Sequence, residues 1–408
     1  MRNHGVSGTR ALAAVAALLA LLAAPAGPAA GQTLRDRLDG ALTVAGVSRA
    51  QTGALAFDLG SGQAVYGLNR TRSLAPASNQ KLGVALAVLD RLGPGYRIRT
   101  EVHGDGSLTG STWQGRLVLK GFGDPTLTTA DLRTLASSLR SAGIRRVTGR
   151  IAGDESYYDR RRTASGWKAS YYKIESPPLS ALVVDRAKAS GRTVDNPALA
   201  AAKAFRRALV AAGIAVGGRA VVGTAPAGSA PIAFVRSGPV RTIVRRMNKV
   251  SDNFYAEMLV KHLGARVRGA GTTAAGCVVV RRELAERGIP LAGVRVADGS
   301  GLSSYNRATA SAVGSLLVSA WRDPVVREPF YDSLPIAGVD GTLEDRMRTG
   351  PARGRVRAKT GTLRVASALS GYAGTRYVFA VLQNGNPISW SRARLAQDRF
   401  AQALARAL

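Results

Sequence analysis

Strand-like segments stand at both ends of this chain, and helix-like segments fill the part between them. Near the start, alternating segments at about 52–58 and 63–67 flank the tight turn Leu59-Gly60-Ser61-Gly62. Near the end, further strand-like segments precede a helical pattern; they lie at about 356–359, 366–372 and 377–383, with the helix at 390–408. We therefore predict an α/β (α+β) chain in which one sheet is assembled from both termini and flanked by helices.

The length of 408 residues exceeds what one core usually needs, so two domains or a large insertion are expected. A separate series of strands and helices runs from about residue 97 to 236, with helices near 129–142 and 197–212 and a strand near 147–151. Helical segments follow at about 240–249, 253–263, 272–287, 308–321 and 343–347. We predict that residues 32–96 and 237–408 form one domain and that residues 97–236 are inserted into it.

Residues 1–31 have the pattern of a secretory signal peptide. Arg2 and Arg10 come first, an apolar run covers 11–24, and small residues follow up to Gly31. The apolar run is shorter than the roughly 20 residues that cross a bilayer as a helix, which favours cleavage over a retained anchor. We expect export to the periplasm, the cell wall or the exterior, with peripheral attachment to the membrane left open.

The formal net charge of +31 suggests a polyanionic neighbour. After export this neighbour would be an anionic wall polymer or a membrane surface, and an arginine-rich composition without any such partner is an equal alternative. The sequence contains no helix-turn-helix, zinc-finger or RNA-binding signature, so nucleic acid is not an expected partner.

Cysteine and histidine are too scarce for several kinds of site. Cys277 is the single cysteine, so no internal disulfide can form, and its apolar surroundings favour a small buried residue. Beyond the leader only His103 and His262 remain, which excludes a histidine-rich metal site and leaves a Ser-His-Asp triad only these two. We expect neither a metal nor a cofactor.

Ser78 stands three residues before Lys81, at the start of an apolar, helix-compatible run. Side chains at this spacing share one face of a helix, and a buried amine can serve as the base that a serine nucleophile needs. The same spacing occurs at Ser165–Lys168 and Ser170–Lys173. It is Lys81 that leads into a helix, because two prolines close behind Lys173 prevent one there.

Two more short motifs accompany this pair. Ser251-Asp252-Asn253 lies between helical segments, and Lys359-Thr360-Gly361 is predicted to end a strand, with the glycine where a substrate backbone passes closely. In order along the chain, the three motifs match the Ser-x-x-Lys, Ser-Asp-Asn and Lys-Thr-Gly set of β-lactamases and penicillin-binding proteins. Asp298-Gly299-Ser300-Gly301 lacks the lysine of a phosphate loop and is interpreted as a turn beside the site.

On these motifs the chain resembles the D-alanyl-D-alanine carboxypeptidase/endopeptidase family, the class C low-molecular-mass penicillin-binding proteins, over nearly all of the mature sequence. Further matching runs begin at Gly123, Gly153, Asp298, Ser333 and Asp340. The resemblance implies a penicillin-binding-protein/β-lactamase-like transpeptidase domain. Its parts would be an antiparallel sheet flanked by helices, an all-helical subdomain, and an inserted α/β accessory domain.

The resemblance also implies an activity: Ser78 attacks the carbonyl of a D-alanyl peptide bond in a peptidoglycan stem peptide and becomes acylated. β-Lactam antibiotics would acylate the same serine. Lys81 would be the base, Ser251 would relay a proton to the leaving amine, and Asn253 would hold Lys81 and the substrate amide.

The third motif would bind the end of the substrate. Lys359 would supply the cation for the substrate carboxylate, and Thr360, Gly361 and Thr362 would line the bound peptide. The oxyanion would lie between the backbone N–H groups of Ser78 and Thr362.

Two other functions stay open at this point. A serine β-lactamase shares the motifs, although the large insertion and the lack of an identifiable general-base carboxylate count against it. A catalytically silent wall-binding protein would use the basic surface and the insertion. The sequence does not decide between carboxypeptidase and endopeptidase action.

Overall fold

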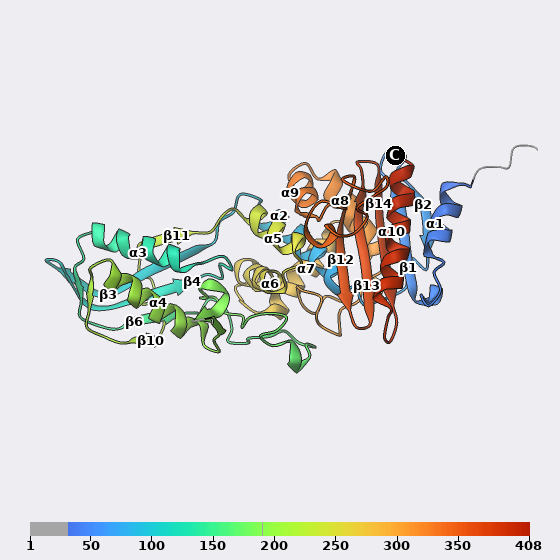
Figure 1. The fold of residues 1–408 in the computed structure, drawn as a ribbon. Coiled ribbons are helices and arrows are strands. Elements are labelled where there is room, and N and C mark those ends of the chain that lie inside the picture. The colour runs from blue at the N-terminus through green and yellow to red at the C-terminus, as the bar shows by residue number, and fades with distance from the viewer. Residues whose placement is uncertain (1–31, 190) are drawn as a thin grey trace, which may run out of the picture.

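The computed structural model describes residues 32–189 and 191–408, so the predicted signal peptide, residues 1–31, lies outside the described residues. Within these residues, no helix combines the length and the apolar character needed to cross a membrane. Figure 1 shows two lobes: one contains both ends of the described chain, and the other contains the segment between α2 and α5.

An antiparallel sheet joins strands from both ends of the chain, which confirms the predicted sheet. Its order among the described residues is β12-β13-β14-β1-β2. These strands are β1 (Thr52–Asp58), β2 (Gln63–Leu68), β12 (Val356–Leu363), β13 (Ala366–Ala373) and β14 (Tyr377–Asn384). The central contact pairs β1 with β14, with Thr52 opposite Gln383 and Asp58 opposite Tyr377.

Helices cover both faces of this sheet, and β14 explains how. Successive side chains of a strand point to opposite faces. Val378 and Leu382 join the core under α2 (Gln80–Leu92), α8 (Ala310–Arg322) and α9 (Arg327–Ser333), whereas Phe379 and Val381 join the core under α1 (Leu34–Leu42) and α10 (Trp390–Arg406). Burial on both faces accounts for the nearly continuous apolar sequence of this strand.

A block of three helices packs around α2 beside the sheet: α5 (Val240–Lys249), α6 (Asn253–Arg268) and α7 (Thr273–Glu286). The helices α6 and α7 approach each other closely at Gly276, where a Cβ atom would lie 1.9 Å from the carbonyl oxygen of Val260. A glycine is therefore required at this crossing.

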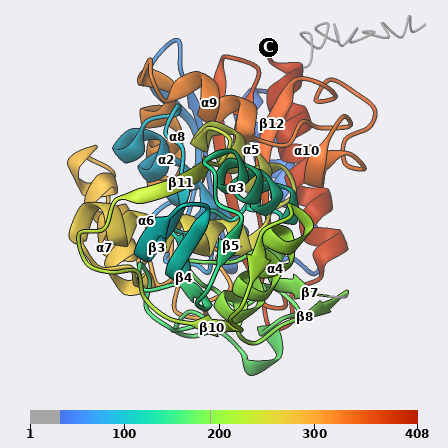
Figure 2. The same ribbon diagram turned by 90° about the vertical axis from the view of Figure 1, so that its left-hand side faces the viewer.

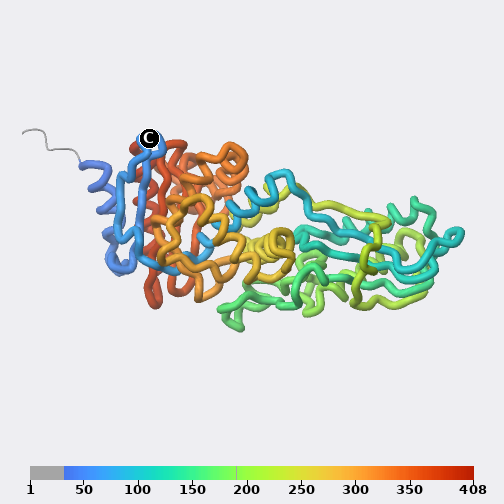
Figure 3. The backbone as a smooth tube through the Cα atoms, turned by 180° about the vertical axis from the view of Figure 1, so that it is seen from behind, coloured from blue at the N-terminus to red at the C-terminus, as the bar shows by residue number. Residues whose placement is uncertain are grey.

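The other lobe has a mixed sheet of its own, seen end-on in Figure 2 and from behind in Figure 3. The strand order along its main path is β10-β6-β4-β3-β11, and β5 and β9 extend it beside β4. The strands are β3 (Arg99–Thr109), β4 (Thr112–Gly121), β5 (Arg146–Val147), β6 (Ile151–Asp154), β9 (Ala215–Val216), β10 (Ala220–Val222) and β11 (Pro231–Arg236). Helices α3 (Thr129–Ser141) and α4 (Pro197–Ala211) close its core, and a small hairpin joins β7 (Lys188–Ala189) to β8 (Arg192–Thr193).

Three local predictions were wrong. The single strand near 147–151 is two strands, β5 and β6, and between them Gly149 packs closely against Gly115 of β4, whose φ is +138°. The helix near 343–347 is only a 3₁₀ turn, Gly341–Leu343, and the left-handed φ of 53° at Met347 stops any continuation. The strand β12 does not end at Lys359-Thr360-Gly361 but continues to Leu363, because it stays paired with β13 as far as Ala366.

The second lobe is attached to α6 by a separate apolar cluster. Tyr158 and Leu179 pack there against Phe254 and Met258 of α6, and the Tyr158 hydroxyl donates to the carbonyl oxygen of Met258 at 3.0 Å. Because α6 begins at Asn253, this cluster connects the lobe to the helix that carries a predicted site residue.

We predict that Gly276→Ala lowers the melting temperature, because the new methyl group meets the Val260 carbonyl at a cost of about 1–3 kcal/mol. Helix propensity alone predicts the reverse, a gain of about 1 kcal/mol. Gly40→Ala is the matched control, since nothing lies within 4 Å of its Cβ position in the exposed part of α1. Thermal unfolding should separate the two variants, and a Gly276→Ala protein as stable as Gly40→Ala would contradict the close packing.

Candidate active site

Ser78 lies in the 3₁₀ turn Ala77–Asn79, directly before the buried helix α2. Ala77 has a left-handed φ of 47°, a conformation that costs a non-glycine residue about 1–3 kcal/mol. The side-chain amide of Asn79 donates to the carbonyl oxygen of Lys359 at 3.0 Å and so ties this turn to β12. The strained turn presents the Ser78 hydroxyl at the edge of the sheet.

Lys81 is in the first turn of α2, and its side chain is completely buried. Its Nζ lies 2.9 Å from Ser78 Oγ, 2.8 Å from Asn253 Oδ1 and 2.6 Å from the carbonyl oxygen of Ser300. Burial lowers the pKa of Lys81 to about 8, while the carboxylates of Asp298 and Glu257 act against this shift. The amine thus contacts the serine with its neutral form accessible near neutral pH.

Ser251 and Asn253 flank the beginning of α6. Ser251 has a left-handed φ of 57°, and its hydroxyl accepts a hydrogen bond from Lys359 Nζ at 2.9 Å. Between them, Asp252 caps α6 by accepting from the Tyr255 N–H at 3.1 Å. The cap fixes the first turn of α6 and therefore the position of Asn253 beside Lys81.

Lys359 is fully buried in β12 and also donates to the carbonyl oxygen of Thr360 at 2.9 Å. Burial and the charge of Lys81 hold the pKa of Lys359 well below its usual range. A carboxylate bound beside Lys359 would raise its pKa again, since an opposite charge favours the ammonium form.

Thr360, Gly361 and Thr362 follow in the same strand. Thr360 donates from Oγ1 to Thr342 Oγ1 at 2.7 Å. A Cβ atom on Gly361 would lie 2.9 Å from the carbonyl oxygen of Pro76, so the backbone that passes closely at this glycine is the chain's own. The absence of a side chain lets β12 lie directly against the turn that carries Ser78.

A cavity of about 450 Å³ opens above these residues. Of the predicted site residues, Ser78, Ser251, Asn253, Thr360 and Thr362 line it. Lys81 and Lys359 lie beneath it with no exposed surface, and Gly361 packs against Pro76. All three motifs, far apart in the sequence, meet at this one cavity, which we call the cleft.

The comparison with known proteins agrees with this geometry. Residues 34–190 and 186–407 match the D-Ala-D-Ala carboxypeptidase 3 (S13) family. The chain belongs to this family. The family match covers nearly all of the described chain, both lobes included.

Relatives in this family are similar along most of their length. A D-alanyl-D-alanine carboxypeptidase of Actinomadura sp. is 30% identical over 91% of this chain and 84% of its own length. Carboxypeptidase DacB of Mycolicibacterium smegmatis is 32% identical over 81% of this chain and 75% of its own. The crystal structure of penicillin-binding protein 4 (dacB) from Haemophilus influenzae has the same fold, with a TM-score of 0.79 at 23% identity, and the match covers 91% of this chain and 98% of that one.

Two residues of the other lobe reach the Ser251-Asp252-Asn253 motif, and the sequence did not reveal either. Glu175 lines the cleft and accepts from Asn253 Nδ2 through its carbonyl oxygen at 3.1 Å and its carboxylate at 3.4 Å. The Arg186 guanidinium donates two hydrogen bonds, of 2.7 and 3.3 Å, to the carboxylate of Asp252. Glu175 is 78 residues from Asn253, and Arg186 is 66 residues from Asp252. At these separations no local sequence pattern could have identified the contacts.

Arg186 is held in an unusual backbone. It lies in a run of three non-glycine residues, Asp185, Arg186 and Ala187, with φ values of 49°, 57° and 57°. Such a run persists only where the surrounding contacts enforce it. One such contact is the ion pair of Arg186 with Asp252, whose side chain is only 6% exposed.

A buried acidic pair holds the Asp298-Gly299-Ser300-Gly301 loop against the site. Glu257 accepts from the N–H groups of Gly299 and Ser300 at 3.0 and 2.7 Å, and burial together with Asp298 raises its pKa to about 8. A Cβ on Gly301, whose φ is +88°, would lie 1.9 Å from the carbonyl oxygen of Ala77. The loop is thus a turn beside the site, as interpreted from the sequence.

The metal site and the two histidines considered from the sequence are the remaining points. Among the described residues no cluster of histidine, cysteine and acidic side chains could hold a metal ion. His262 bonds to the Phe122 carbonyl oxygen and the Tyr96 hydroxyl, and burial lowers its pKa to about 4. His103 contacts Ser229, but that hydroxyl donates to the carbonyl oxygen of Pro226 at 2.8 Å.

We predict that Arg186→Ala slows acylation of Ser78 by a fluorescent penicillin about tenfold, because a buried carboxylate that loses its partner destabilises the first turn of α6. Arg186→Lys keeps the charge and should recover part of the rate. The matched control is Arg116→Ala, which removes an ion pair with Asp105 inside the same lobe. Equal rates for Arg186→Ala and Arg116→Ala would contradict the link to the motif.

Proposed function

We propose that this protein is a serine-type D-Ala-D-Ala carboxypeptidase/endopeptidase that acts on peptidoglycan stem peptides through an acyl-enzyme on Ser78. The observation that carries the proposal is the 2.9 Å contact between Ser78 Oγ and the buried Lys81 Nζ at the floor of the cleft. Family membership supports it, because relatives are named D-alanyl-D-alanine carboxypeptidases.

The surroundings of Lys81 suit a general base. Asn253 Oδ1 and the Ser300 carbonyl oxygen can only accept hydrogen bonds, so they take the two N–H groups of a neutral amine. The lone pair then points to Ser78 Oγ and can receive its proton as the hydroxyl attacks the D-alanyl carbonyl carbon.

The second motif serves the leaving group in this mechanism. Ser251 lines the cleft and is bonded to Lys359, so its hydroxyl is available to pass a proton to the departing D-alanine nitrogen. Attack by Ser78 breaks the peptide bond and releases the terminal D-alanine, and water then hydrolyses the acyl-serine ester.

The third motif holds the peptide. Lys359 supplies the positive charge for the terminal carboxylate, assisted by the Thr360 hydroxyl, and Thr362, which lines the cleft, continues the strand along the substrate. The backbone N–H groups of Ser78 and Thr362 stabilise the oxyanion, with about 3 kcal/mol for each donor.

β-Lactams fit the same chemistry because a strained cyclic amide replaces the D-alanyl peptide bond. One solved penicillin-binding protein 4 from H. influenzae is complexed with a β-lactam. We propose that β-lactams acylate Ser78 and inhibit this protein covalently.

One observation favours a serine β-lactamase as a second candidate. Glu175 provides the cleft with a carboxylate beside Asn253, where the sequence had suggested none. Rapid turnover of a chromogenic β-lactam would favour this alternative, whereas slow release of the bound penicillin favours the peptidase.

We further propose that the protein is exported and acts at the cell wall. The leader pattern of residues 1–31 supports export, and the net charge of +31 supports contact with an anionic wall polymer or membrane surface. The chemistry supports the same location, because the peptidoglycan substrate lies outside the cytoplasm.

We predict that penicillin adds one acyl group to the intact protein and that Ser78→Ala abolishes both this adduct and the release of D-alanine from muropeptides. Mass spectrometry of the protein and chromatography of the muropeptides measure the two effects. The reason is that the family chemistry requires one covalent intermediate on one hydroxyl. An adduct that survives in Ser78→Ala would refute the assignment.

We also predict that the acylation rate rises with pH to a plateau above about 8, since only the neutral Lys81 amine can accept the proton. Below that value the rate should fall about tenfold per pH unit. Glu175→Gln removes a negative charge that raises the pKa of Lys81 and should move the midpoint to lower pH. A profile that is flat, or a midpoint unchanged in Glu175→Gln, would contradict this role of Lys81.

A further inference from the structure

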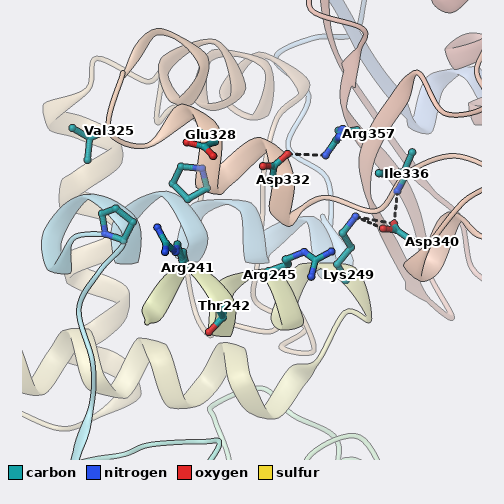
Figure 4. Close-up of a pocket in the computed structure, with 12 residues that line it drawn as sticks. Arg241, Thr242, Arg245, Lys249, Val325, Glu328, Asp332, Ile336, Asp340 and Arg357 are labelled. Carbon is teal, nitrogen blue, oxygen red and sulfur yellow. Dashed lines mark hydrogen bonds and ion pairs between the residues drawn. The ribbon is translucent and has the colours of Figure 1, made fainter. Parts of the chain in front are cut away.

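A second cavity, of about 640 Å³, lies between α5 and α9, and we call it the α5–α9 cavity (Figure 4). One wall carries Arg241, Arg245 and Lys249 of α5, and the facing wall carries Glu328 and Asp332 of α9. Figure 4 shows Lys249 directed from α5 toward Asp340, and the Glu328 and Asp332 side chains on the α9 side of the cavity. None of its lining residues lines the cleft.

Most of the acidic groups in this cavity already have partners. Lys249 Nζ lies 2.5 Å from Asp340 Oδ2, and Arg357 lies 2.9 Å from Asp332 Oδ1. These two ion pairs lie within the cavity lining. They leave Arg241, Arg245 and Glu328 as the charged lining residues outside them.

Arg241, Arg245 and Glu328 are exposed, and none forms an ion pair or a side-chain hydrogen bond with the described residues. Arg241 and Arg245 are four residues apart on α5, so both guanidinium groups lie on one face of the helix. Adjacent like charges repel, and a planar guanidinium pairs best with a carboxylate through two parallel hydrogen bonds. The basic wall therefore offers a carboxylate site, and Glu328 across the cavity offers an ammonium site.

Apolar side chains complete the lining. Pro94, Val325, Pro329 and Ile336 surround the charged groups. A cavity of this size, lined by charged side chains with apolar ones between them, has room for a small molecule or a short peptide.

The cavity and the cleft share a thin wall. A Cβ on Gly341 would lie 2.4 Å from the carbonyl oxygen of Lys249, so the 249–251 and 340–342 segments lie backbone to backbone. Lys249 and Asp340 face the α5–α9 cavity, whereas Ser251 and Thr342 face the cleft. A ligand here would lie next to the cleft without entering it.

We propose that the α5–α9 cavity is a second, non-catalytic binding site for a peptide that carries both a free carboxylate and a free amine. The carboxylate pairs with Arg241 and Arg245, and the amine pairs with Glu328. The assignment of this peptide as a peptidoglycan stem peptide rests on the proposed function, since such peptides carry both groups. The site would keep the protein on its polymer while the cleft releases product.

The test uses the full-length protein with Ser78 acylated by penicillin, so that the cleft is blocked. The probe is a synthetic stem tetrapeptide with a free carboxyl terminus and a free side-chain amine, titrated by calorimetry. We expect one binding event, weakened about tenfold or more by the double substitution Arg241→Gln/Arg245→Gln and by amidation of the peptide carboxylate. Glu328→Gln should weaken binding of the same peptide but leave binding of its N-acetylated form unchanged.

Arg246→Gln is the matched control, because Arg246 is a neighbouring exposed arginine on α5 that does not line the cavity. It should bind the peptide like the unsubstituted protein. No binding to the acylated protein, or equal loss in Arg246→Gln and the double variant, would overturn the site. Failure of penicillin to acylate Ser78 would instead count against the proposed function, so the two failures are distinguishable.

Discussion

The burial of the Lys81 amine is the interaction on which the site depends. Removing an ammonium group from water costs several kcal/mol unless hydrogen bonds replace the lost solvent. Three separate segments provide these bonds, through Ser78, Asn253 and Ser300. These segments cannot move apart without leaving the amine unsatisfied, and the same burial lowers its pKa to about 8. One constraint therefore both assembles the site and supplies its proposed base.

Close backbone packing accompanies this burial. Gly301 and Gly361 let two segments approach the turn that carries Ser78, at the carbonyl oxygens of Ala77 and Pro76. Left-handed conformations at Ala77 and Ser251 adjoin the same place. The strain is tolerated because the surrounding sheet and helices fix these residues from several sides.

The lobe formed by the middle of the chain takes part in the site. Arg186 holds Asp252, Glu175 accepts from Asn253, and the indole of Trp167 donates to Asp298 at 2.9 Å. An apolar cluster with α6 supports these contacts. The lobe therefore fixes the orientation of the second motif, which explains why a change such as Arg186→Ala can act on chemistry at Ser78.

The sequence by itself determined most of the local elements and the three motifs, because strand alternation, helical apolar runs and short spacings are local properties of the chain. It also indicated that both termini share one sheet. Only the tertiary structure decided that β12 continues through Lys359-Thr360-Gly361 and that Gly361 packs against Pro76. It also decided that Glu175 lines the cleft and that Arg186 reaches Asp252. Those contacts join residues far apart in sequence, and they depend on how whole elements pack, which no local pattern encodes.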